Sequence, residues 1–307
     1  MSGNSSARSE IFAPGVLSGR VVLVTGGGTG LGRATAHELV RCGARVTIAG
    51  RRADVLEQAV VEISGGGAEA GVRAEADAGM EPRAATASGM VDCIAADIRE
   101  PRDAQRLIET VVERHGRLDV LVNNAGGQYF VPAEGIAAKG WGAVWRLNVD
   151  GMLNMSQAAY EHALRPAGAG TIVNVTLSPH HGMPGMAHSG AARATVEALT
   201  RELAATWGPQ GVAVTAVAAG HFDTEAMGKY PDVVRAGMAR SVPMQRLGSV
   251  LEHAWLVALL CSPLGRALSG SVVTLDGARD NWFGPWPPPG MADGGGEVPT
   301  EQRRARG

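Results

Sequence analysis

The sequence predicts a doubly wound α/β fold: a parallel seven-stranded sheet with helices on both faces. Over most of the 307 residues, short apolar runs alternate with longer segments whose apolar residues recur at helical spacing. Strands that alternate with helices pair in parallel, because each helix carries the chain back across the sheet. An apolar fraction of 45% is typical of a soluble globular protein. We therefore expect a single domain at residues 17–280.

Seven apolar runs predict the strands. In chain order they are residues 21–24, 46–49, 91–96, 120–122, 171–175, 212–217 and 272–275. Short runs that are apolar throughout are typical of strands buried on both faces, which agrees with helices above and below the sheet.

The segments between these runs predict the helices. Ala36, Leu39 and Val40 share one face of a helix that begins near Gly30 and ends at Gly43. The other predicted helices include residues 56–63, 107–116, 139–163, 196–207 and 254–260. Ser249 and Glu252, three residues apart before the last of these, predict a capping box.

Three segments do not follow the pattern. Residues 1–16 predict a flexible leader, and residues 64–89, rich in Ala and Gly, predict a mobile insertion. Residues 281–307 contain a Pro-rich patch and a Gly run, so we expect a tail that is extended or disordered.

Charge and composition exclude several classes of protein. A net charge of −2 provides no basic surface for nucleic acid. No apolar run approaches the roughly 20 residues that span a bilayer, and the polar N-terminus is not a signal peptide. The three cysteines are widely spaced and form no CxxC pair, so we expect reduced thiols in a cytoplasmic protein.

A glycine-rich loop, Thr-Gly-Gly-Gly-Thr-Gly-Leu-Gly, connects the first predicted strand to the first predicted helix. Glycines let the backbone approach a diphosphate, and the free N–H groups and dipole of a helix start favour its charge. In this position the loop predicts a dinucleotide-binding Rossmann fold; the alternative is a turn without a ligand. The predicted contacts are Thr25, Gly26, Gly28, Thr29, Gly30, Leu31 and Gly32.

The end of the second strand predicts which dinucleotide binds. NAD sites usually place an acidic residue here for the ribose hydroxyls, but this chain has Arg51 and Arg52 and no acid before Asp54. Guanidinium groups match a 2′-phosphate through charge-assisted hydrogen bonds. The pair therefore predicts NADP(H), the alternative being two solvated arginines. Arg33, just after the glycines, is a further candidate for a phosphate contact.

Further motifs follow the later strands and occur in the long helix. They are Asp97-Ile98 after the third strand, Asn-Asn-Ala-Gly at 123–126 after the fourth, Asn148, and Asp276-Gly277 after the seventh. Together with the glycine loop, they resemble the short-chain dehydrogenase/reductase family over about residues 17–280.

This resemblance implies roles for individual residues. Asp97 and Ile98 would contact adenine, residues Asn124, Ala125 and Gly126 would support the cofactor, and Asn148 would hold a relay position. Residues 219–245 would form a substrate lid, in which Gly220 belongs to the family's Pro-Gly turn and Thr224 contacts the nicotinamide amide. The helices at 138–163 and 188–207 would form the interface of a homodimer or homotetramer.

A narrower resemblance involves the segments 126–130, 132–134, 139–141 and 188–193. These segments look like the trans-2-enoyl-CoA reductase branch of the family. That branch implies reduction of the C=C bond of acyl-CoA thioesters by NADPH. The branch is peroxisomal in animals, but the C-terminal Arg-Arg-Ala-Arg-Gly of this chain is not a peroxisomal address.

The chain departs from the family at the catalytic pair. The family places a tyrosine, and a lysine four residues later, at the start of the helix after the fifth strand, where the tyrosine transfers a proton and the lysine lowers its pKa. We align these positions with His188 and Ala192, so the pair is absent. The family's serine falls near Leu177, with Thr176 and Ser178 as neighbours.

The missing pair affects two reactions differently. Carbonyl reduction forms an alkoxide that needs an adjacent proton donor, whereas conjugate C=C reduction spreads charge into a thioester carbonyl that hydrogen-bond donors can stabilise. His188, with an ordinary pKa of about 6.5, is the candidate acid, the alternative being a histidine that only fills space. Thr176 and Ser178 are candidate donors to the carbonyl. His180 and His181 lack a third ligand at useful spacing, so we expect no metal.

The sequence as a whole therefore predicts an NADP(H)-dependent oxidoreductase acting on the enoyl or carbonyl group of a small hydrophobic substrate such as an acyl thioester. Its catalytic residues would be Asn148, Thr176, Ser178 and His188. The alternative is an NADP(H)-binding protein without redox turnover, which acts as a sensor, a partner subunit or a redox-neutral tailoring protein.

Overall fold

The computed structural model describes residues 9–65, 91–178, 180, 185–225, 227 and 232–282. Residues 1–8 of the predicted leader lie outside these ranges. So do nearly all of the predicted insertion at 64–89 and of the predicted tail at 281–307.

All seven predicted strands are present and form one sheet, in which every neighbouring pair is parallel. The strands are β1 (Val21–Thr25), β2 (Arg45–Gly50), β3 (Val91–Ala95), β4 (Val120–Asn123), β5 (Gly170–Leu177), β6 (Val212–Ala219) and β7 (Val272–Leu275). Their order is β3-β2-β1-β4-β5-β6-β7. The predicted doubly wound Rossmann architecture is confirmed.

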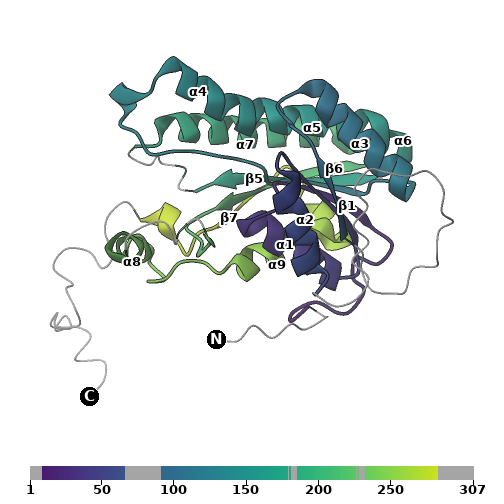
Figure 1. Ribbon diagram of the computed structural model, residues 1–307, viewed down its shortest axis with the longest axis horizontal. Helices are drawn as coiled ribbons and strands as arrows, with labels where there is room; N and C mark the ends of the chain where they lie inside the picture. Colours follow the sequence, from purple (N-terminus) through teal and green to yellow (C-terminus); the bar gives the residue numbers. More distant parts are fainter. Residues whose placement is uncertain are drawn as a thin grey trace.

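Helices cover both faces of this sheet (Figure 1). They are α1 (Gly30–Arg41), α2 (Ala53–Ile63), α3 (Pro101–His115), α4 (Ala138–Trp145), α5 (Gly151–Ala159), α6 (Arg165–Ala167), α7 (Ala187–Trp207), α8 (Asp232–Arg240) and α9 (Val250–Cys261). Helices α1, α2 and α9 form one layer, and α3 to α7 form the other. Within the described part of the chain, none of the helices combines the length and apolarity that a membrane span requires.

Alternate residues of each central strand supply the two halves of the core. On β1, Val22 and Val24 pack toward α1, α2 and α9, whereas Val21 and Leu23 pack toward α3 and α5. Successive strand side chains point to opposite faces, so a strand that is apolar throughout is buried on both sides. This packing holds the carboxyl ends of the strands in a fixed arrangement.

The segment from α4 to α6 is one continuous helix, interrupted by π-helical turns at Arg146–Asp150 and Tyr160–Leu164. The long helix predicted at 139–163 is therefore confirmed, whereas its π-helical turns were not predicted. The first turn contains Asn148, whose Nδ2 donates to the carbonyl oxygen of Val144 at 2.8 Å. Single π turns within α-helices occur frequently at functional sites.

The three cysteines are free thiols, as the sequence predicts. Cys42 and Cys261 are buried between the helices of the α1 and α9 layer. Burial raises the pKa of the Cys42 thiol to about 12, so this group stays protonated near neutral pH.

The predicted capping box is present at the start of α9. The Leu251 amide donates to Ser249 Oγ at 3.2 Å, and the Ser249 amide donates to Glu252 Oε2 at 2.7 Å. We expect Ser249→Ala to lower the free energy of unfolding by about 1 kcal/mol, because the helix start loses a side-chain acceptor. Urea denaturation measures this, with Ser64→Ala at the exposed end of α2 as control. Equal effects of the two substitutions would contradict the prediction.

Candidate active site

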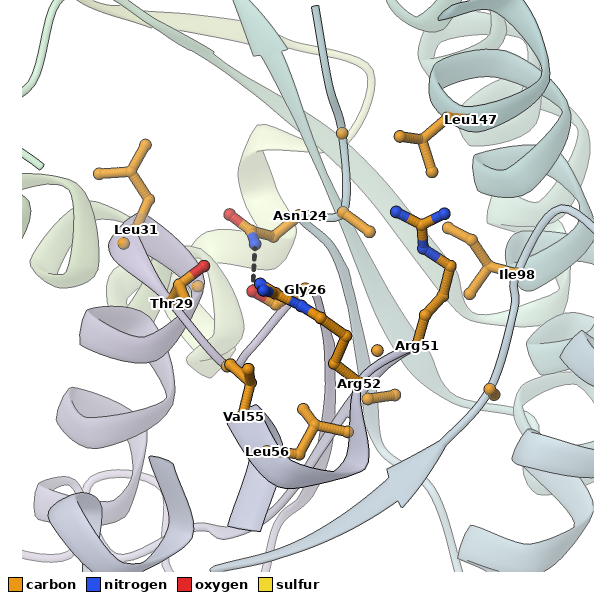
Figure 2. Close-up of a pocket in the computed structure, with 18 of the residues that line it drawn as sticks. Gly26, Thr29, Leu31, Arg51, Arg52, Val55, Leu56, Ile98, Asn124 and Leu147 are labelled. Carbon is orange, nitrogen blue, oxygen red and sulfur yellow. Dashed lines mark hydrogen bonds between the residues drawn. The ribbon is translucent and has the colours of Figure 1, made fainter. Parts of the chain in front are cut away.

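A groove of about 390 Å³ opens at the carboxyl ends of the strands, where β1 lies between β2 and β4. The strand order changes direction at this point, because β2 follows β1 on one side and β4 lies on the other. Ligands of open α/β sheets bind in the crevice at such a point. Figure 2 shows the residues around it. Its lining includes every predicted cofactor contact except Thr25 and Gly220: Gly26, Gly28, Thr29, Gly30, Leu31, Gly32, Arg51, Arg52, Asp97, Ile98, Asn124, Ala125, Gly126 and Thr224.

The glycines of the loop allow close packing of backbone against backbone that side chains would prevent. A Cβ on Gly26 would lie 2.9 Å from the Cα of Ala125, and one on Gly32 would collide with the Gly26 carbonyl oxygen. A Cβ on Gly28 would lie 3.1 Å from Val55. Gly26 also has a φ of +67°, which favours glycine. The bare backbone between β1 and α1 fits a dinucleotide diphosphate.

Thr25 and Asn124 hold this loop against β4. Thr25 Oγ1 accepts hydrogen bonds from the amides of Asn124 and Ala125, both at 3.1 Å. Asn124 Nδ2 donates to the Thr25 carbonyl oxygen at 3.0 Å and, more weakly, to that of Gly26 at 3.3 Å. Thr25 therefore anchors the loop beneath the groove instead of lining it.

Arg51 and Arg52 follow β2 on the wall of the groove, and both are exposed. Beside them, after β3, Arg99 donates to both carboxylate oxygens of Asp97. Hydrogen bonding from Arg99, supported by the more distant charge of Arg51, lowers the pKa of Asp97. Among the described residues, neither arginine forms an ion pair. Both line the groove, where their guanidinium groups are accessible to an anion (Figure 2).

Arg33 forms ion pairs with Glu62 on α2 and with Glu225 after β6. It lines a second pocket of about 410 Å³ rather than the groove of the glycine loop. Because two carboxylates already engage it, Arg33 connects α1 to the segment after β6. Gly220 likewise lies outside the groove, where a Cβ would come within 2.5 Å of Asp276 Cβ.

Asn148 connects the loop after β4 to the long helix. Its Oδ1 accepts from the Gly127 amide at 3.1 Å, and its Nδ2 donates to the carbonyl oxygens of Gly127 and Val144, both at 2.8 Å. The structure thus places Asn148 beside Gly126, with a positioning contact to the loop that borders the groove.

The two candidate hydroxyls at the end of β5 donate to protein groups. Thr176 Oγ1 donates to the carbonyl oxygen of Arg193 at 3.3 Å, and Ser178 Oγ donates to Asp276. Both hydroxyls are buried. They lie on the carboxyl edge of the sheet near Gly220, and each retains only its capacity to accept a hydrogen bond.

His188 lies in the first turn of α7 and is 1% exposed. Its ring faces that of Tyr129 at a centroid distance of 4.5 Å. Neither ring nitrogen has a hydrogen-bond partner among the described residues. A buried donor without a hydrogen-bond partner costs about 1–3 kcal/mol. Binding of a ligand that supplies such a partner to the His188 ring is therefore favoured.

The sequence alignment did not identify Arg193, which is the basic side chain that reaches the loop after β4. Its Nη2 lies 2.5 Å from the position of a Cβ on Gly126. Ala192, the aligned lysine position, packs instead against Val144 and Val149. Ser189, four residues before Arg193, donates to Gln128 Oε1 at 3.1 Å. The helical face toward the loop therefore carries Ser189 and Arg193.

His180 lies after β5 between two carboxylates. Its Nε2 is 2.8 Å from Glu197 Oε1 on α7, and its Nδ1 is 2.5 Å from Asp280 Oδ2. Partial burial opposes a charge on the ring, but the hydrogen bond to Asp280 and the two negative charges outweigh it and raise the pKa of His180. His181 lies outside the described residues, and within them no three potential metal-ligating side chains cluster.

We expect these ion pairs to stabilise the fold at acidic pH. The folded-state pKa of His180 lies above its ordinary value of about 6.5, so the contribution is complete below that value and is lost as the pH passes the folded pKa. The free energy of unfolding of the wild type minus that of His180→Gln should therefore decrease between about pH 6 and pH 9. Urea titrations across this range would contradict the prediction if the difference stayed constant.

Comparison with protein families and curated proteins assigns the chain. A family model described as enoyl-(acyl carrier protein) reductase matches residues 67–278, and one described as short chain dehydrogenase matches residues 20–77. A probable 2,4-dienoyl-CoA reductase of Bacillus subtilis is 33% identical over 87% of this chain and 98% of its own length. A peroxisomal 2,4-dienoyl-CoA reductase of Danio rerio is 31% identical over 88% of this chain and 84% of its own length.

Solved structures agree with this assignment. A citronellol catabolism dehydrogenase of Pseudomonas aeruginosa is 36% identical and superposes with a TM-score of 0.73, over 88% of this chain and 98% of that one. A putative NAD(P) dependent gluconate 5-dehydrogenase of Beutenbergia cavernae, solved with bound NADP, is 28% identical with a TM-score of 0.75, over 88% and 100% of the two chains. The chain thus belongs to the short-chain dehydrogenase/reductase family of oxidoreductases.

Proposed function

We propose that the protein is an NADP(H)-dependent reductase of the C=C bond of acyl thioesters, of the 2,4-dienoyl or 2-enoyl class. The observation that carries this proposal is the first part of α7, which presents the buried His188 and the half-buried Arg193 toward the loop bordering the groove. Donors of this kind suit a reaction that places negative charge on a carbonyl oxygen. The relatives named as dienoyl-CoA reductases support the same substrate class.

The groove supports the choice of cofactor. The glycine loop and the N-terminus of α1 would bind the diphosphate, and Arg51 with Arg52 would bind the 2′-phosphate of NADP(H). Asp97 and Ile98, on the same lining, would contact the adenine. When bound, NADPH supplies the hydride.

The residues of this chain would complete the reaction at the carbonyl and at the α-carbon. Donors beside Gly126 hold the thioester oxygen while hydride addition shifts the electrons of the C=C bond toward it. His188 or a water molecule then gives a proton to the carbon chain. Asn148 positions the loop, through its three hydrogen bonds to Gly127 and Val144.

A panel of thioesters and ketones tests the proposal. Oxidation of NADPH is followed by absorbance with 2,4-dienoyl-CoA, 2-enoyl-CoA and simple ketones, and each assay is repeated with NADH. We expect turnover with the thioesters and NADPH, and little with ketones. Tight binding of NADPH without its oxidation by any compound would instead indicate a sensor or partner-subunit function. The absence of the family's tyrosine and lysine pair is the observation that favours this alternative.

A further inference from the structure

We infer that Arg33 is a positioning residue that holds the segment after β6 (residues 222–225) against α1 and thereby slows release of the dinucleotide from the groove. The inference rests on the proposed function, because it requires NADP(H) to bind there. It gives Arg33 a role other than the direct phosphate contact that its place in the sequence suggests. The step that Arg33 would control is cofactor exchange, which is separate from the chemistry on the substrate.

The segment after β6 forms a wall between two pockets. Gly30, Thr224 and Glu225 line both the dinucleotide groove and the second pocket of about 410 Å³. A Cβ on Gly30 would lie 3.9 Å from Thr224 Cγ2, so the segment passes close to the start of α1. The start of α1 is where a diphosphate would bind. Movement of this wall away from α1 would therefore widen the groove at the diphosphate.

The beginning of the segment is fixed to the rest of the fold. Phe222 is 6% exposed and forms a parallel bridge with Gly248. The Asp223 amide donates to the Gly248 carbonyl oxygen at 2.9 Å, and the Asp223 carboxylate pairs with Arg235 on α8 at 3.2 Å. These contacts hold residues 222 and 223, but they do not join Glu225 to α1.

Arg33 makes that connection from the first turn of α1. Its Nη2 pairs with Glu225, and its Nη1 pairs with Glu62 near the end of α2. Because the two carboxylates engage different nitrogens of one planar guanidinium, Glu62 can orient Arg33 while Arg33 holds Glu225. Arg33 lines the second pocket and not the groove, so it holds the wall from the side away from the dinucleotide.

An attraction between this cluster and the diphosphate does not explain the arrangement. The carboxylates of Glu62 and Glu225 outnumber the single positive charge of Arg33, so the cluster as a whole would repel a phosphate. A cation in the first turn of a helix is also unfavourable with respect to the helix dipole. A contribution of the cluster to cofactor binding would therefore come from the position of the wall.

Glu225→Gln distinguishes the two effects, because they change the release rate in opposite directions. Removing a negative charge beside the diphosphate should slow release, whereas freeing the wall should accelerate it. We expect NADPH to dissociate about twofold to fivefold faster from Glu225→Gln and from Arg33→Gln, the effect of a half-exposed ion pair. Stopped-flow displacement of bound NADPH by excess NADP⁺, followed by nicotinamide fluorescence, measures the rate.

Further variants test whether the contact itself is responsible. The double variant Arg33→Gln, Glu225→Gln should release NADPH no faster than the faster single variant, because both substitutions break one contact. Arg33→Lys keeps the charge and should stay closer to the wild-type rate than Arg33→Gln. NADH should show the same acceleration, since it carries the same diphosphate. Arg117→Gln before β4 and Glu113→Gln on α3 are controls of equal charge change and should not alter release.

The outcomes separate this inference from the proposed function. Unchanged or slower release from Glu225→Gln would overturn the inference, and faster release from Arg33→Gln alone would make Arg33 a direct phosphate ligand. Both results leave the proposed function intact if the wild type reduces thioesters. Dinucleotide binding without thioester reduction would overturn only the proposed reaction, and a wild type that binds neither dinucleotide would overturn both. If Arg33→Gln does not fold, Glu225→Gln decides alone, because the Glu225 side chain is 56% exposed.

Discussion

Arg51→Ala is expected to weaken NADP(H) binding by at least about tenfold more than NAD(H) binding. A hydrogen bond to a charged group contributes about 1.5–3 kcal/mol, and every 1.4 kcal/mol changes a dissociation constant about tenfold. NAD(H) lacks the 2′-phosphate, so it loses no such bond. Arg51 lines the groove next to the Asp97 wall and is exposed, which leaves its guanidinium free to meet a phosphate.

Fluorescence titration of wild type and Arg51→Ala with both dinucleotides measures the effect. Arg117→Ala is the control, because Arg117 precedes β4 at the opposite edge of the sheet and changes the net charge equally. A proportional loss of affinity for both dinucleotides, or for neither, would contradict the assignment of NADP(H). Adding Arg52→Ala should increase the discrimination further, since both arginines face the same groove.

His188→Phe should lower turnover by about 100-fold or more, because the ring keeps its volume but loses the proton that general acid catalysis requires. NADPH affinity should stay near the wild-type value, since His188 is not among the residues that line the dinucleotide groove. The contact with Tyr129 can persist between two aromatic rings, so stability should change little.

Steady-state kinetics and NADPH titration of His188→Phe test this prediction, with His162→Phe on the distant end of the long helix as control. If turnover is unaffected, His188 is a packing residue, and the proton comes from water.

Most of the fold could be predicted from the sequence, because its cause is local in the chain. Short, mainly apolar runs predict strands buried on both faces, and Ser249 with Glu252 marks the start of α9. The strand ends were predicted less well. The predicted fourth strand ended at its last apolar residue, whereas the observed β4 pairs with β5 through Asn123. Strand pairing uses backbone hydrogen bonds, so it does not require an apolar side chain.

The residues that the sequence groups as cofactor contacts nearly all line one groove, since their motifs directly follow the strands that position them. Gly26 could be predicted from its place just after β1, and Gly32 from its place in the first turn of α1. Arg33 shows where this reasoning fails: it follows the glycines in sequence, but Glu62 and Glu225 engage it. Those acidic residues come from distant parts of the chain, and no local pattern brings them together.

The sequence by itself determined the sheet, the order of its elements and the glycine loop, because each depends on the spacing of neighbouring residues. Only the tertiary structure decided which side of α7 faces the groove. One residue along a helix turns a side chain by about 100°, which separates Ala192, packed on the long helix, from Arg193 beside Gly126. That rotation is set by how α7 packs against its neighbours, so the position of the half-buried Arg193 became evident only in three dimensions.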